Sequence, residues 1–210
     1  MVCFPVQMKL ILASSSPRRA EILRAAGFSF DVLPADIDET LRPGEAATEY
    51  VRRLAEKKAR TVARKIAAAE PDATAIIIAA DTTVVVNGAI LGKPESTSDA
   101  QRMLEQLSGR THDIYTGVAL LRLPDGVERI LVDVTRVDFA ELSVQEIADY
   151  VASGEPFGKA GGYAIQGLGG RFVKRIEGCY FNVMGMPLGR IYQELRKIQE
   201  ETAPARTHLT

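Results

Sequence analysis

The run Ala75–Val86, with the sequence AIIIAADTTVVV, limits the fold of this chain more than any other segment. Nearly all of its residues are apolar or β-branched, which is typical of a central strand buried on both faces of a sheet. Asp81 lies inside the run, and a carboxylate buried without a partner is costly. Two interpretations follow: backbone donors at a strand end satisfy Asp81, or it is a metal ligand or general base at the mouth of a cleft.

Strands and helices alternate along the rest of the chain. Short apolar or alternating runs predict further strands at residues 9–13, 28–33 and 172–176. Periodicity, serine caps and glycine stops predict helices at residues 17–26, 45–69, 98–107, 144–152 and 188–199.

Two turns complete this outline. Asn87-Gly88 is a hairpin signal, and Pro124-Asp125-Gly126 joins two strand-like runs, 113–123 and 129–141, into an antiparallel hairpin. The glycine-rich segment 154–170 is too irregular for a helix. We therefore predict an α/β fold, a single domain with a mixed sheet, whose strands carry the site at their C-terminal ends.

The composition is that of one globular domain. The chain has 210 residues, of which 46% are hydrophobic and 25% are charged, enough for one substantial core. A net charge of −1 gives no general attraction to polyanions, so we expect neither a nucleic acid polymer nor a membrane as partner. The sequence has no apolar stretch of about 18 residues and no export signal, which predicts a cytoplasmic protein. Cys3 and Cys179 have no CxxC spacing, which argues against a disulfide framework or a zinc site.

Lys58 is placed unusually for a lysine. It lies within a helical stripe that also contains Val51, Leu54, Val62 and Ile66, so it points inward with the apolar face. Either it binds an anion there, or its stem packs while the ammonium reaches solvent at the edge of the core. The apolar stripe by itself predicts that Lys58→Met lowers activity without lowering the melting temperature, because methionine suits such a stripe.

The segment Ser14-Ser15-Ser16-Pro17-Arg18-Arg19 is suited to phosphate. It combines free backbone N–H groups at a helix start with two arginines. The alternative is an ordinary capped helix with surface arginines, and Lys93 is likewise either a phosphate ligand or a surface lysine. The chain has no GxxxxGK[ST] loop and no GxGxxG after a strand, which disfavours P-loop and dinucleotide-binding folds.

Four segments of this chain resemble the Maf family of nucleotide pyrophosphatases: LILASSSPRRAEIL, DTTVVVNGAILGKP, TGVAL and GYAIQGLGGRFVKRIEGCYFNVMGMPL. Within that family, the glutamine at Gln166 resembles the dTTP/UTP pyrophosphatase branch. The resemblance implies an elongated α/β fold with two lobes around a central cleft, related to inosine triphosphate pyrophosphatases. We expect this domain over residues 9–200, an N-terminal extension at 1–8, a frayed tail at 201–210, and a homodimer.

The resemblance also implies roles for nine residues. Asp81 would be the catalytic proton acceptor, and Ser14 would lie beside the phosphates in the first loop. Substrate choice would be set by Arg18, Thr82 and Gln166. The residues expected to surround the phosphates are Glu39, Lys58, Lys93, Arg18 and Arg19.

These roles imply the hydrolysis of dTTP and UTP, or modified pyrimidine nucleotides, to the monophosphate and pyrophosphate. Asp81 and Glu39 would hold Mg²⁺ or Mn²⁺, because hard cations favour carboxylate oxygens. The alternatives are a 7-methyl-GTP or inosine triphosphate pyrophosphatase, and a non-catalytic nucleotide-binding regulator of cell division.

Overall fold

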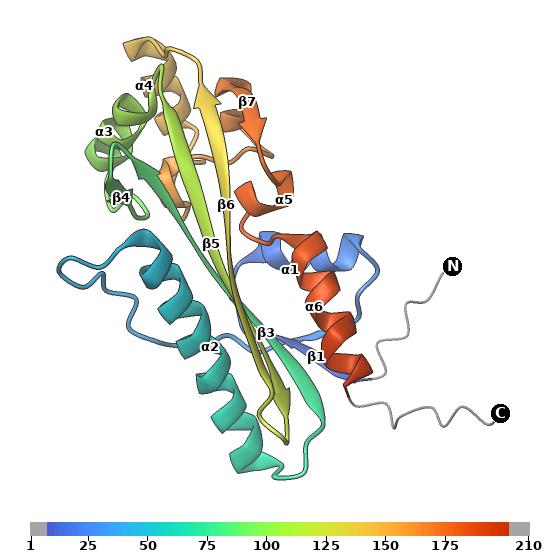
Figure 1. Ribbon diagram of the computed structural model, residues 1–210. Coiled ribbons are helices and arrows are strands. Elements are labelled where there is room, and N and C mark those ends of the chain that lie inside the picture. The colour runs from blue at the N-terminus through green and yellow to red at the C-terminus, as the bar shows by residue number, and fades with distance from the viewer. Residues whose placement is uncertain (1–7, 202–210) are drawn as a thin grey trace.

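A seven-stranded mixed sheet forms the frame of the molecule (Figure 1). The computed structural model describes residues 8–201. The strand order is β2-β1-β3-β5-β6-β7, with β4 paired to β3. β1 is parallel to both of its neighbours, and the other pairings are antiparallel. The strands are β1 (Lys9–Leu12), β2 (Asp31–Val32), β3 (Ala75–Val86), β4 (Ala89–Leu91), β5 (Thr111–Leu123), β6 (Glu128–Phe139) and β7 (Val173–Glu177).

The strand β3 is the predicted central strand. It pairs with β1 on one side and with β5 on the other, and it is buried along almost its whole length. Asp81 faces Gly117 of β5 across the ladder. A Cβ on Gly117 would lie 2.2 Å from the carbonyl oxygen of Val51, so this glycine lets a helix approach the sheet closely beside Asp81.

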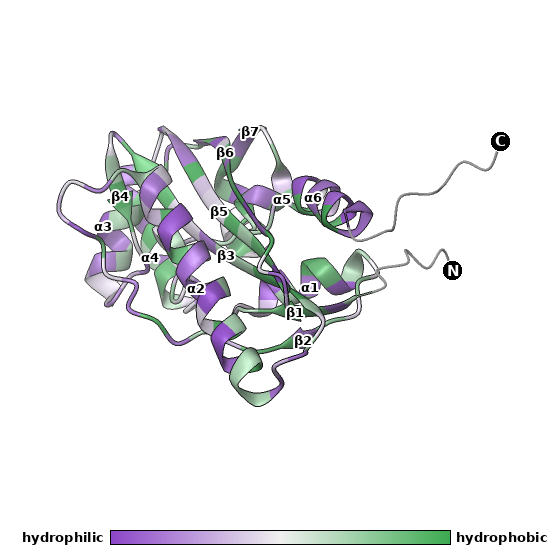
Figure 2. Ribbon diagram, turned by 60° about the horizontal axis from the view of Figure 1, so that its bottom comes forward, coloured by the Kyte–Doolittle hydropathy of each residue, from purple (hydrophilic) through white to green (hydrophobic). Residues whose placement is uncertain are grey.

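Helices lie on both faces of the sheet around β1, and a second group of helices packs at the far ends of the long strands. α1 and α6 share a core with β1, β3 and β5, and α2 packs on the opposite face of these strands. α3 and α4 pack on the far ends of β3, β5 and β6. Hydrophobic residues are concentrated in the long strands, and hydrophilic ones in the flanking α2 and α6 (Figure 2). The helices are α1 (Pro17–Ala25), α2 (Ala47–Ala69), α3 (Thr97–Leu107), α4 (Val144–Ala152), α5 (Tyr180–Val183) and α6 (Leu188–Glu200), with 3-10 turns at Ala160–Gly162 and Leu168–Phe172.

The predicted α/β fold with a mixed sheet is confirmed, and Figure 1 shows its two lobes, one with α1, α2 and α6 and the other with α3, α4 and β7. The long strands β3, β5 and β6 run through both lobes (Figure 1). Asn87 and Gly88, with φ of 50° and 77°, form the predicted turn between β3 and β4. Ser143 caps α4 in a capping box with Glu146.

The strand predicted at residues 28–33 is mostly wrong, since only Asp31 and Val32 pair with β1. Phe28 is buried in the core instead, where it packs with α1. β2 lies at the edge of the sheet and pairs with β1, a strand of four residues. The remaining residues of the predicted strand therefore have no neighbouring strand to which they can hydrogen-bond. Residues 1–7 of the predicted extension, which include Cys3, and most of the predicted tail lie outside the described residues. Within residues 8–201, no helix is both long and apolar enough to span a membrane.

Candidate active site

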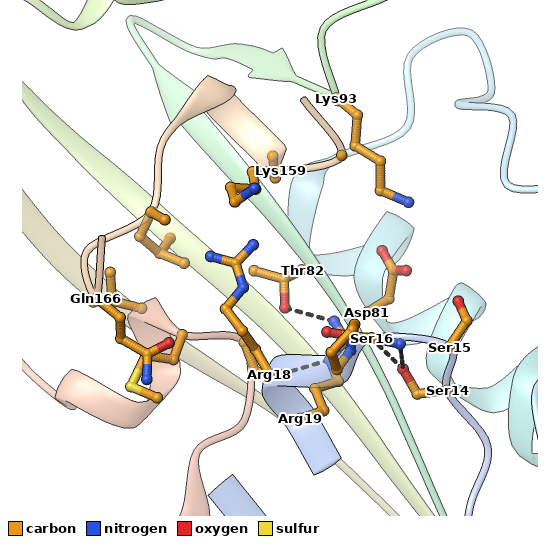
Figure 3. Close-up of a pocket in the computed structure, with 18 of the residues that line it drawn as sticks. Ser14, Ser15, Ser16, Arg18, Arg19, Asp81, Thr82, Lys93, Lys159 and Gln166 are labelled. Carbon is orange, nitrogen blue, oxygen red and sulfur yellow. Dashed lines mark hydrogen bonds between the residues drawn. The ribbon is translucent and has the colours of Figure 1, made fainter. Parts of the chain in front are cut away.

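A cavity of about 850 Å³ opens between the two lobes. It is bordered by the β1–α1 loop, α2, the middle of β3, the loop after β4 and the glycine-rich segment (Figure 3). The fold thus brings together all nine residues predicted from the sequence, although they are spread from position 14 to position 166. These residues are Ser14, Arg18, Arg19, Glu39, Lys58, Asp81, Thr82, Lys93 and Gln166.

Lys58 joins two carboxylates at the wall of this cavity. Its Nζ lies 2.6 Å from Oδ1 of Asp81 and 2.6 Å from Oε1 of Glu39. Lys58 and Asp81 are each only 7% exposed. The inward orientation of Lys58 is therefore confirmed, and two carboxylates rather than solvent at the edge of the core are the partners of its ammonium. Asp81 is satisfied by this ammonium rather than by backbone donors.

Glu39 and Lys93 continue the charged group outward. Oε2 of Glu39 lies 3.5 Å from Nζ of Lys93, and the Lys93 side chain is 61% exposed. Partial burial alone would raise the pKa of Glu39, but the contact with Lys58 and the charges of Lys58 and Lys93 lower it below its ordinary value. Glu39 is therefore ionised at neutral pH, beside a second cation that faces solvent.

Asp81 and Glu39 fit the chemistry of a divalent metal. Their carboxylates converge on one nitrogen, and hard cations prefer oxygen donors of this kind. In residues 8–201, no group of three His, Cys, Asp or Glu side chains forms a closed metal cage. Mg²⁺ commonly binds through one or two carboxylates together with substrate phosphates and waters, so this pair suits an ion that arrives with a triphosphate.

The start of α1 presents donors to the cavity. Ser16 occupies the N-cap position, but its side chain makes no capping hydrogen bond. Its backbone N–H instead donates to Oγ of Ser14 at 3.2 Å. The N–H groups in the first turn of a helix form an anion site when no cap occupies them. Ser16 thus occupies the predicted N-cap position, but its side chain does not cap the first turn.

A family model described as "Maf-like protein" matches residues 9–198. The chain belongs to the Maf family. It is 48% identical over 193 residues to a protein of Carboxydothermus hydrogenoformans, covering 90% of this chain and 98% of the relative. A protein of Syntrophus aciditrophicus is 46% identical over 200 residues, with 95% of both chains covered. One from Clostridium perfringens is 48% identical over 189 residues, covering 90% and 96%. All three relatives are named dTTP/UTP pyrophosphatase.

The two adjacent arginines of this Maf protein have different surroundings. Arg19 is buried, and its guanidinium donates to the carbonyl oxygens of Gly185 and Ala80 and to the hydroxyls of Ser14 and Thr82. Four of its five N–H donors are therefore used within the protein. The interpretation as a surface arginine is wrong for Arg19, which ties the first loop to β3 and leaves one N–H for a substrate.

Arg18 extends into the cavity toward the glycine-rich segment (Figure 3). Burial lowers its pKa below the ordinary value, which leaves an arginine still charged at neutral pH. Lys159, which the sequence interpretation missed, lies on the opposite side of the cavity (Figure 3). Burial, followed by the charge of Arg18, lowers the pKa of Lys159. A lysine whose charged form is disfavoured by burial and by a neighbouring arginine is well placed for a polyanionic ligand.

The sequence offered little to identify Lys159, because a lysine in an irregular segment is usually on the surface. Its position depends on Glu155, which also escaped notice. The Glu155 carboxylate accepts hydrogen bonds from the backbone N–H groups of Leu168 and Gly169 and from the Tyr150 hydroxyl. This carboxylate folds the glycine-rich segment back on itself and so carries both Lys159 and Gln166 to the cavity.

Gln166 borders the cavity, as predicted. Its side chain is exposed, and none of the hydrogen bonds among the described residues involves its amide. An amide can rotate to present either its donor or its acceptor. A fixed orientation of Gln166, which discrimination between bases would require, is therefore not provided by hydrogen bonds within residues 8–201.

Proposed function

We propose that this Maf protein hydrolyses dTTP and UTP to the nucleoside monophosphate and pyrophosphate. The observation that carries the proposal is the Lys58 ammonium, which contacts the buried Asp81 and the half-buried Glu39. All three lie at the wall of a cavity that is also lined by cationic side chains. The relatives named dTTP/UTP pyrophosphatase support the choice of nucleotides. A protein that only bound nucleotide would have no need of a buried base.

Asp81 serves as the proton acceptor in this proposal. It takes a proton from water as the water oxygen bonds to the α-phosphorus and the bond from that phosphorus to the bridging oxygen breaks. The electron pair leaves with pyrophosphate. Arg18, Lys93 and Lys159 offset the negative charge that accumulates on this leaving group, which is the largest contribution in most phosphoryl-type reactions. Lys58 orients Asp81 through their ion pair.

We also propose that Asp81 and Glu39 bind Mg²⁺ or Mn²⁺. When bound, such an ion lowers the pKa of a coordinated water and neutralises phosphate charge. Thermal melts with increasing Mg²⁺ or Mn²⁺ in the presence of a non-hydrolysable UTP analogue test this site without turnover. The metal should raise the melting temperature of the wild type, because a ligand that binds only the native state stabilises it. An equal rise in Glu39→Gln would remove Glu39 from the site.

Product analysis tests the activity. Purified protein is incubated with Mg²⁺ and each of UTP, dTTP, CTP, GTP, inosine triphosphate and 7-methyl-GTP, and nucleotides and phosphates are separated by anion exchange. UMP with pyrophosphate, in equal amounts, supports the proposal. UDP with orthophosphate contradicts attack at the α-phosphorus, and preference for a purine triphosphate contradicts the substrate assignment. Asp81→Asn serves as the control for a contaminating hydrolase.

We also propose that the protein is cytoplasmic and forms a homodimer. Nucleoside triphosphates are substrates of the cytoplasm, and the resemblance to the Maf family implies a dimer. Light scattering coupled to gel filtration tests the dimer: a mass near twice 22.8 kDa supports it, and a mass near 22.8 kDa overturns it.

A further inference from the structure

A buried polar network lies beneath the Thr82 side chain, at the floor of the cavity. The hydroxyl of Thr82 accepts a hydrogen bond from Nη2 of Arg19 at 3.0 Å and lies 3.0 Å from the hydroxyl of Thr116 on β5. The Thr116 hydroxyl in turn lies 3.3 Å from the backbone carbonyl of Asn182 in α5. Thr116 and Asn182 are both fully buried, so water does not compete for these bonds.

The direction of each hydrogen bond in this network follows from counting protons. A guanidinium and a backbone carbonyl have fixed roles, as donor and acceptor respectively. Because Thr116 has one proton and faces the carbonyl of Asn182, it donates there and accepts from Thr82. The Asn182 carbonyl also accepts from the Gly185 N–H at 2.8 Å, and the reverse direction would leave the Thr116 oxygen facing this carbonyl at 3.3 Å with no proton between them.

The proton of Thr82 is therefore used inside the protein. Its oxygen has two lone pairs, one of which is taken by Arg19, so a single lone pair remains. Gly185 leaves this oxygen uncovered, because a Cβ at that position would lie 2.9 Å from Oγ1 of Thr82. Thr82 and Gly185 both border the cavity. Toward a ligand in the cavity, Thr82 is thus an acceptor only.

We propose that Thr116 is a positioning residue that fixes Thr82 as an acceptor for the N3–H of uracil and thymine. This inference rests on the proposed function. Cytosine has an unprotonated N3, so it would face the Thr82 lone pair with a lone pair of its own. Gln166 lacks a hydrogen bond that fixes its amide, and a rotating amide can match either base. Rejection of CTP would then depend on the fixed Thr82 rather than on Gln166 alone.

Two substitutions of Thr116 test the inference. Thr116→Val keeps the shape of the side chain but removes the acceptor, so the Thr82 proton is free to turn toward the cavity. The ratio of kcat/KM for UTP to that for CTP should fall about tenfold, the effect of one hydrogen bond. Thr116→Ser restores the hydroxyl and should restore the ratio.

Thr135→Val is the matched control. Thr135 is also a fully buried threonine and accepts from the side-chain amide of Asn182 at 3.0 Å, but its hydroxyl does not contact Thr82. Its loss should lower stability to a similar degree and leave the UTP to CTP ratio within about twofold. A fall in the ratio for Thr135→Val as large as for Thr116→Val would assign the effect to general loosening and overturn the inference.

Other outcomes also decide the matter. An unchanged ratio in folded Thr116→Val, or equal losses on UTP and CTP, overturns the role of Thr116. Should Thr116→Val fail to fold, Thr82→Val replaces it: a fall in the ratio supports the acceptor role, and an unchanged ratio refutes it. If the wild type hydrolyses UTP but the variants keep the wild-type ratio of kcat/KM for UTP to that for CTP, this inference is refuted and the proposed function is not. If the wild type has no activity on UTP, the proposed function is refuted, and so is this inference.

Discussion

Replacing Lys58 with methionine tests how far the stability of this protein depends on its active site. The apolar stripe of α2 alone predicts that methionine melts no lower than lysine, yet the ammonium contacts both Asp81 and Glu39 at 2.6 Å. Without it, the buried Asp81 loses the cation that contacts it directly, and Glu39 lies nearby as a second carboxylate. The ion pairs reverse the prediction, and Lys58→Met should be less stable than the wild type.

The size of this effect follows from burial. Removing one partner of a buried ion pair costs about 3–5 kcal/mol. Asp81 is only 7% exposed but borders a cavity that water enters, and the Glu39 side chain is 39% exposed, so the lower end applies. A loss of about 3 kcal/mol in a domain of this size lowers the melting temperature by roughly 6–12 °C.

Urea denaturation of four proteins measures this cost: the wild type, Lys58→Met, Asp81→Asn and the double variant. The double variant should recover much of the loss, because a neutral amide beside methionine leaves no buried charge. If Lys58→Met unfolds at the same urea concentration as the wild type, desolvation of the lysine offsets its ion pairs. The argument from the two carboxylates would then be refuted.

Three further predictions concern catalysis, pH and base choice. Asp81→Asn should keep the fold and lose about 10²–10⁴-fold in kcat; a variant with more than roughly a tenth of the wild-type rate would assign the base elsewhere, with Glu39 next. Burial lowers the pKa of His112 to about 4. Between about pH 6.5 and 4 the imidazole is therefore protonated in the unfolded chain but neutral in the folded protein, and stability should fall as the pH drops through this range. Urea midpoints of wild type and His112→Gln across that range check this, since the variant should lose the part of the slope due to His112; equal slopes would contradict it. Gln166→Glu should lower kcat/KM for UTP and dTTP together and for CTP less, because a carboxylate repels O4 and cytosine has an amino group in that place; equal loss on all nucleotides in steady-state kinetics would remove Gln166 from base recognition.

Much of the fold could be predicted from local sequence patterns. The apolar run 75–86, the Pro124-Asp125-Gly126 turn and the helical stripe around Lys58 each identify an element, because periodicity and turn chemistry act within a few neighbouring residues. The same patterns singled out Asp81 and Lys58 as charges in apolar surroundings. The prediction that the first loop binds phosphate also rested on a local pattern, free N–H groups beside two arginines.

Only the tertiary structure decided which of these side chains meet. Lys58 reaches Asp81 because α2 crosses the sheet closely at Gly117, and no local pattern encodes the crossing. Arg18 and Arg19 are adjacent in sequence. Arg18 extends into the cavity, whereas the Arg19 guanidinium donates to the carbonyl of Gly185, a residue 166 positions away. Lys159 depends in the same way on the fold of the glycine-rich segment. Contacts between distant segments are set by how helices and strands pack, and a local pattern carries no information about its distant partner.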